Sequence, residues 1–162
     1  MSRLDSFIRR LQAQRACIDA AAGMIAELEG PVFELGLGNG RTYDHLRQRL
    51  RDREIFVFDR QLAAHPACLP DATHLFLGDI HETLPAAVAR YEGTVALIHS
   101  DIGTGDAEAN AAIAAFLSSH LAALLRPGGL VISDQPMAMA AAESLPLPDG
   151  VKPGRYFIYR RR

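Results

Sequence analysis

Apolar residues follow two different spacings along the chain, and the first predicts a helix. Leu4, Leu11 and Ile18 recur every seven residues, with arginines and glutamines on the opposite face, which is typical of an amphipathic helix. Gly23 weakens the middle of this segment, so two helices remain open. The Gly30-Pro31 step ends the helical region.

The rest of the chain alternates short apolar runs with helical spacing. Apolar runs closed by Gly, Asp or a polar residue predict buried strands at 32–35, 55–58, 75–77, 95–99 and 130–133. Helical spacing predicts helices at 42–51, 82–91 and 106–125, and a turn near 146–150 precedes a closing strand at 156–159. This alternation predicts an α/β fold: a Rossmann-like, doubly wound, mostly parallel sheet with a C-terminal antiparallel strand and an N-terminal helical segment.

Length and composition indicate one domain over 1–162, with 1–30 as a helical lid and 31–162 as the core. The net charge of -2 disfavours a general nucleic-acid binder. Lys152 is the only lysine, which excludes a P-loop lysine earlier in the chain. Cys17 and Cys68 have no disulfide or zinc spacing. Without a signal peptide or membrane span in the pattern, we expect reduced thiols and a cytoplasmic location.

A glycine-rich loop follows the first predicted strand and reads Glu34-Leu35-Gly36-Leu37-Gly38-Asn39-Gly40. Its glycines let the backbone approach a ligand closely, and the helix that begins near Thr42 points free N–H groups towards that ligand. Arg41 stands where the GxGxxG dinucleotide fingerprint has its last glycine. Glu34 would repel a pyrophosphate, so the loop favours a cationic sulfonium nucleoside over NAD.

The segment Val32–Gly40 resembles the first motif of class I S-adenosylmethionine-dependent methyltransferases. The resemblance continues in order through Asp59, then Gly78-Asp79-Ile80, then the Pro-Gly-Gly turn within Leu124–Ile132. The whole chain is also similar to a small bacterial subfamily of S-adenosylmethionine methyltransferases that shares the runs 36–44 and 101–106. This resemblance implies that Asp59 accepts the ribose hydroxyls and that Asp79 lies near the adenine amino group. It implies cofactor binding by Glu34, Gly36, Leu37, Gly38, Asn39, Gly40, Thr42, Asp59, Arg60, Gly78, Asp79, Ile80 and His99.

Polar residues after the fourth and fifth strands are candidates for the chemistry. Asp101 is the predicted catalytic residue, with capping of the Gly103–Gly105 turn as its alternative. His99 lies either near the reacting methyl group or in the core as a hydrogen-bonded histidine. Asp134-Gln135 resembles the Asp-Asn pair with which catechol-type O-methyltransferases hold a divalent cation. Because Gln replaces Asn we assign no metal ligand, and the hypothesis requires Asp101 and Asp134 within about 5 Å of each other.

These observations predict an S-adenosylmethionine-dependent methyltransferase that acts on a small-molecule acceptor. An aminopropyltransferase-like enzyme is one alternative; it would need paired carboxylates near the site, for which Asp101 and Asp106 are available. A module that only binds the cofactor is another, since fold does not fix function. The predicted lid covers the site. Arg160–Arg162 is either a contact for an anionic acceptor or a solvated tail. The sequence leaves a homo-oligomer open.

Overall fold

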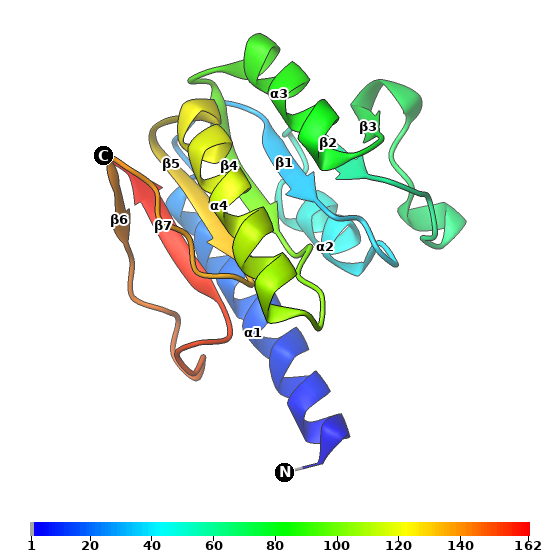
Figure 1. Ribbon diagram of the computed structural model, residues 1–162, viewed down its shortest axis with the longest axis vertical. Helices are drawn as coiled ribbons and strands as arrows, with labels where there is room; N and C mark the ends of the chain where they lie inside the picture. The colour runs from blue at the N-terminus through cyan, green and yellow to red at the C-terminus, as the bar shows by residue number, and fades with distance from the viewer. Residues whose placement is uncertain (1) are drawn as a thin grey trace.

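The computed structural model describes residues 2–162, in which helices and strands alternate along most of the chain (Figure 1). The helices are α1 (Arg3–Met24), α2 (Arg41–Arg49), α3 (Ile80–Tyr91) and α4 (Ala107–Leu124), with short 3₁₀ turns at Pro66–Cys68 and Ala72–His74. The strands are β1 (Val32–Leu35), β2 (Ile55–Asp59), β3 (Leu75–Leu77), β4 (Val95–Ser100), β5 (Leu125–Ser133), β6 (Ala142–Ser144) and β7 (Phe157–Arg161). Within the described residues no helix is both long enough and apolar enough to cross a membrane.

All seven strands form one sheet in the order β3-β2-β1-β4-β5-β7-β6. The first five are parallel, β7 pairs antiparallel with β5, and β6 pairs antiparallel with β7. The predicted mostly parallel, doubly wound sheet is therefore confirmed. Because the strand order reverses beside β1, the carboxyl ends of β1 and β4 flank the switch point at which such sheets bind ligands.

Helices cover both faces of the sheet, since a strand buried on both sides needs a partner layer on each. On one face α1 and α2 pack through Ile18 and Leu46 against inward residues that include Val57 and Ile132. On the other face α3 and α4 pack around Phe33, whose ring lies edge-on to Tyr91 at a centroid distance of 5.4 Å. Figure 1 shows α3 and α4 in front of the sheet and α1 behind it.

The element boundaries differ from the sequence expectation in three places. α1 runs through Gly23 without a break, so the two-helix alternative is wrong. The Arg126–Gly129 turn lies inside β5, which begins directly after α4 and carries a register shift against β4. The pattern did not predict β6, because a three-residue edge strand is defined by its pairing with β7 rather than by local spacing.

Candidate functional site

A pocket of about 400 Å³, the switch-point pocket, opens at the carboxyl edge of the sheet. Its volume falls within the range of about 300–1,000 Å³ that is usual for small-molecule sites. It lies between the loops that follow β1, β2 and β3 and the loop that leads into α4. The residues that line it are Gly36, Gly38, Phe58, Asp59, Arg60, Gly78, Asp79, Ile80, His81, Asp101, Ile102, Gly103, Thr104, Ala109, Asn110 and Ile113.

The glycine loop is held against this pocket by close backbone packing and by Asp59. Gly36 has a φ of 91°, and a Cβ atom there would lie 2.5 Å from the Ile102 side chain and 3.0 Å from the Asp101 carbonyl oxygen. Only glycine fits this position. The Leu37 and Gly38 N–H groups donate to Asp59 Oδ2 at 2.8 and 3.1 Å. Asp59 Oδ1 accepts a third hydrogen bond, from the Gln61 N–H at 3.2 Å. The carboxylate thus fixes the loop, lines the pocket and keeps one lone pair on Oδ1 for a ligand.

Asp79 holds its position by capping α3. Its Oδ1 accepts a hydrogen bond from the His81 N–H at 2.8 Å and lies 2.8 Å from the His81 ring Nδ1. The backbone hydrogen bond from His81, followed by the contact with the His81 ring, holds the pKa of Asp79 below its ordinary value. The carboxylate therefore stays ionised at the rim of the pocket, where it can accept N–H or O–H donors of a ligand.

Glu34 and His99 form a buried pair beneath the loop. Glu34 Oε2 lies 2.6 Å from His99 Nδ1, and both side chains are fully buried. The Thr42 hydroxyl donates to the other Glu34 oxygen. Burial lowers the pKa of His99, but the charge and hydrogen bond of Glu34 outweigh it, so the net shift is upward. This pair therefore joins β1, β4 and the start of α2.

Eight predicted site residues line the switch-point pocket, and six do not. The pocket includes Gly36, Gly38, Asp59, Arg60, Gly78, Asp79, Ile80 and Asp101. Its lining excludes Glu34, Leu37, Asn39, Gly40, Thr42 and His99. Glu34 and His99 are both buried and bonded to each other, and their contact with a cofactor stays a prediction.

Asp101 is held by two side chains from α1. Arg10 Nη2 donates to Asp101 Oδ1 at 2.6 Å, and Gln14 Nε2 donates to Asp101 Oδ2 at 2.5 Å. Only 14% of the Asp101 side chain is exposed. Because Arg10 and Gln14 are four residues apart, they lie on the same face of α1. The first helix of the chain therefore reaches the carboxyl end of β4.

Asp134 lies beside Asp101 at the end of β5, and we call these two residues the acidic pair. Burial and the negative charge of Asp101 raise the pKa of Asp134 to about 6. Gln135 Nε2 donates to Asp134 Oδ2 at 3.1 Å. A Cβ atom on Gly103 would lie 2.3 Å from Asp134 Oδ2, so the backbone at Gly103 closes over this carboxyl.

The acidic pair does not fit a divalent cation, although Asp101 is close enough for its charge to shift the pKa of Asp134. The Arg10 guanidinium already neutralises Asp101, and Gln135 turns its NH₂ group, which is not a metal ligand, towards Asp134. Among the described residues, no group of three or more His, Cys, Asp or Glu side chains could hold a metal ion. We therefore assign no catechol-type metal site.

Sequence reasoning missed three residues of this region: Arg10, Gln14 and Tyr156. The Tyr156 ring is fully buried and stacks on the His99 ring with centroids 6.2 Å apart. Burial and the charges of the acidic pair raise the pKa of the Tyr156 hydroxyl. The four-residue spacing of Arg10 and Gln14 was a detectable signal for one polar helix face, but nothing local indicated that Asp101 was its partner.

The fold and the pocket together define a class of protein. A parallel sheet with a switch point beside β1, a glycine loop, and an acid after each of β2 and β3 is a Rossmann-like, class I methyltransferase arrangement. The family described as S-adenosyl-L-methionine methyltransferase matches residues 1–161. The chain belongs to this family, and it is an S-adenosylmethionine-dependent methyltransferase.

Solved structures agree with this assignment. An S-adenosyl-L-methionine methyl transferase from Silicibacter pomeroyi DSS-3 is 49% identical, with a TM-score of 0.95 over 100% of this chain and 99% of that one. An O-methyltransferase family protein from Burkholderia thailandensis is 16% identical, with a TM-score of 0.51 over 90% of this chain and 55% of that one. A probable spermidine synthase from Corynebacterium glutamicum ATCC 13032 is 16% identical, with a TM-score of 0.55 over 75% and 46%. The last two show the fold alone. No curated protein matches the chain.

Proposed function

We propose that the switch-point pocket binds S-adenosylmethionine and that its methyl group passes to a small-molecule acceptor beside the acidic pair. One observation carries this proposal. Asp101 lines the pocket and also lies beside Asp134, so the ligand pocket adjoins a group that can accept a proton. S-adenosylmethionine, when bound, supplies an electrophilic methyl group on a sulfonium.

The pocket residues suit the different parts of that molecule. Asp59 and Asp79 offer charged acceptors for ribose hydroxyls and an adenine amino group. Ile80, Ile102 and Ile113 offer apolar surface for the base. Gly36 and the other loop glycines bring the backbone close to the ligand without a Cβ atom in the way.

The acidic pair can take the proton that an O–H or N–H acceptor loses. A group with a pKa of about 6, such as Asp134, is largely ionised at neutral pH and is still basic enough to accept a proton. Among the described residues, Asp134 Oδ1 is buried and has no hydrogen-bond partner, so it has lone pairs available. We assign Asp101, the predicted catalytic residue, to binding and to holding Asp134 at a raised pKa.

The same contacts argue against aminopropyl transfer. A polyamine needs uncompensated carboxylates, but Arg10 neutralises Asp101. Asp106, the second available carboxylate, caps α4 by accepting a hydrogen bond from the Ala109 N–H at 2.9 Å. Neither residue is free to attract a cationic substrate.

The N-terminal segment serves as the lid in this proposal. Arg10 and Gln14 bring α1 to the carboxyl edge, where it shields Asp101 from water. Because Arg10 and Gln14 contact Asp101 directly, a small molecule is the acceptor that we propose for this edge of the sheet. Two free thiols, Cys17 and Cys68, suit the reducing cytoplasm that we propose as the location.

Calorimetric titration of the protein with S-adenosylmethionine and with NAD tests the ligand assignment. We expect binding of the sulfonium and none of the dinucleotide. Incubation with methyl-labelled donor and a low-molecular-weight bacterial extract then tests transfer. Binding of NAD without binding of S-adenosylmethionine would refute the proposal.

A further inference from the structure

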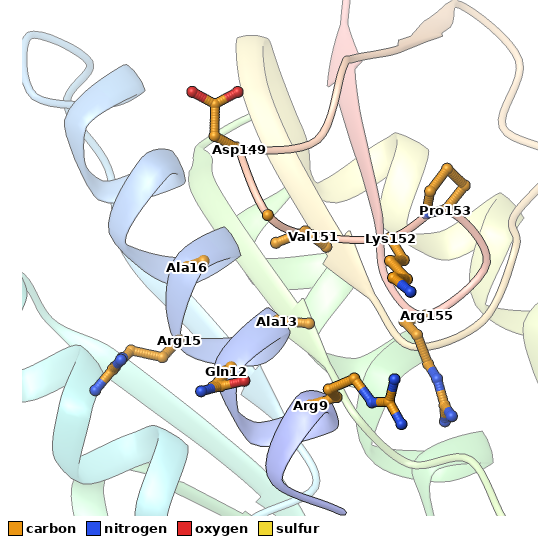
Figure 2. Close-up of a pocket in the computed structure, with 11 residues that line it drawn as sticks. Arg9, Gln12, Ala13, Arg15, Ala16, Asp149, Val151, Lys152, Pro153 and Arg155 are labelled. Carbon is orange, nitrogen blue, oxygen red and sulfur yellow. The ribbon is translucent and has the colours of Figure 1, made fainter. Parts of the chain in front are cut away.

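A second pocket, which we call the basic pocket, lies between α1 and the loop before β7. Its volume is about 490 Å³. One wall consists of α1 residues and the other of the 149–155 segment (Figure 2). The residues that line it are Arg9, Gln12, Ala13, Arg15, Ala16, Asp149, Gly150, Val151, Lys152, Pro153 and Arg155.

The basic pocket concentrates positive charge in a protein whose net charge is -2. Figure 2 shows Arg9, Lys152 and Arg155 around one side of it, whereas Asp149 and Arg15 point away. Within the described residues none of these three cations has a carboxylate partner within ion-pair distance; Arg155 donates to the Ser6 hydroxyl at 3.0 Å. The nearby carboxylates are those of Asp149, which points away, and of exposed Asp5, whose pKa is lowered chiefly by Ser2 and to a lesser extent by Arg9. Three cations against these two carboxylates leave an excess of positive charge that attracts an anion.

The pocket also offers apolar surface beside the charges. Ala13, Ala16, Val151 and Pro153 line it together with the stems of the basic side chains. A concave surface of this kind suits a compact molecule with an anionic group and an apolar body. A nucleic acid would instead need a basic stripe along the surface.

Two chain neighbours connect the basic pocket to the acidic pair. Arg9 precedes Arg10, which binds Asp101. Arg155 precedes Tyr156, whose hydroxyl faces the charges of Asp101 and Asp134. The cations of the basic pocket therefore belong to α1 and to the segment before β7, and both of these segments also reach the acidic pair.

We propose that the basic pocket binds an anionic group, a carboxylate or a phosphate, of the acceptor molecule. This inference rests on the proposed function, because it names the acceptor class of that site. Arg9 and Arg155 supply hydrogen-bond donors in a fork that matches such groups, and Lys152 adds a point charge. Bound in this way, the acceptor presents its nucleophile towards the acidic pair and away from the basic pocket.

Titration with pyrophosphate or malonate, followed by ¹H–¹⁵N spectra, tests the pocket without any methyl transfer. We expect shifts of the Ala13, Gly150 and Val151 amides. In the Arg9→Gln/Arg155→Gln variant the affinity should fall about tenfold or more, because charge-assisted hydrogen bonds are lost. The control, Arg51→Gln/Arg162→Gln, removes the same charge from exposed sites elsewhere and should bind like the wild type. No localised shifts with either anion, or unchanged affinity in the pocket variant, would overturn the proposal.

A transfer assay tests whether the anion belongs to the acceptor. A small-molecule extract is separated on an anion-exchange resin, and each fraction is incubated with protein and methyl-labelled donor. We expect labelling in the retained fraction, about tenfold slower for the pocket variant, with donor affinity unchanged. Labelling only in the unretained fraction, or displacement of pyrophosphate by an oligonucleotide that is itself methylated, would overturn the inference. Absence of labelling in both fractions would count against the proposed function, whereas the pyrophosphate titration still decides the pocket.

Discussion

Two sets of carboxylates at the carboxyl edge of the sheet are held in opposite ways. Asp59 and Asp79 accept hydrogen bonds from backbone N–H groups close by in the chain or in the adjoining loop, and the pKa of Asp79 is lowered. Asp101 and Asp134 are held by side chains from distant elements and by each other, and the pKa of Asp134 is raised. Hydrogen bonds from N–H donors favour the ionised carboxylate, whereas burial beside a second carboxylate favours the protonated one.

Removing the buried Glu34 carboxylate should give the largest change in the free energy of unfolding. Glu34→Leu leaves the buried His99 ring without its carboxylate, so we expect a loss of about 3–5 kcal/mol in the free energy of unfolding, measured with urea. The control is Glu92→Gln, at an exposed position. The double variant Glu34→Leu/His99→Leu, which removes both charges, should recover part of the loss. A single variant as stable as the wild type would show that the pair does not support the loop.

Removing Asp59, one of the two carboxylates held by backbone N–H groups, should weaken cofactor binding while the sheet stays folded. Asp59→Ala loses the loop contacts and the proposed bonds to the ribose, so affinity for S-adenosylmethionine should fall at least about tenfold. Calorimetry measures this, with Asp52→Ala in an exposed turn as the matched control. Unchanged affinity in a folded Asp59→Ala variant would move the ribose contact to another residue.

Asp134, one of the two carboxylates held by side chains, should make the free energy of unfolding depend on pH. Because the folded-state pKa of Asp134, about 6, lies above the ordinary value of an aspartate in the unfolded chain, its protonated form favours folding. This contribution is complete at the lowest pH and is lost as the pH rises through about 6. Asp134→Asn removes it, so the melting temperature of the variant relative to the wild type should be higher at pH 7.5 than at pH 4.5. A constant difference between the two proteins would show that Asp134 titrates normally.

The smallest expected effect comes from substitutions of Asp79, which caps α3 and also lines the switch-point pocket. Asp79→Ala removes the cap of α3 and should lower the free energy of unfolding by about 1 kcal/mol. Asp79→Asn keeps a capping oxygen and removes the charge, so it should melt near the wild type but bind S-adenosylmethionine more weakly. Equal binding by Asp79→Asn and the wild type would show that the charge at this position is used only by the helix.

The sequence predicts the surroundings of Asp59 and Asp79 well and those of Asp101 and Asp134 poorly, for a physical reason. The glycine loop, Asp59 and Asp79 lie at the ends of predicted strands, and the helix predicted at 106–125 is confirmed as α4. Local spacing contains that information. The partners of Asp101 lie 91 and 87 residues away, so their meeting depends on how α1 crosses the finished sheet.

The position of α1 also has a consequence for how the chain folds. α1 packs against β5 and shares a hydrophobic cluster with Tyr156 and Ile158, which lie far from it along the chain. α1 also contacts α2, where Asp19 Oδ1 lies 2.8 Å from His45 Nε2 and 2.6 Å from Arg49 Nε, so only part of its packing depends on the C-terminal strands. Contacts of such long sequence separation slow folding and expose apolar surface in the meantime. The helix that holds Asp101 therefore docks fully only when distant parts of the chain have come together.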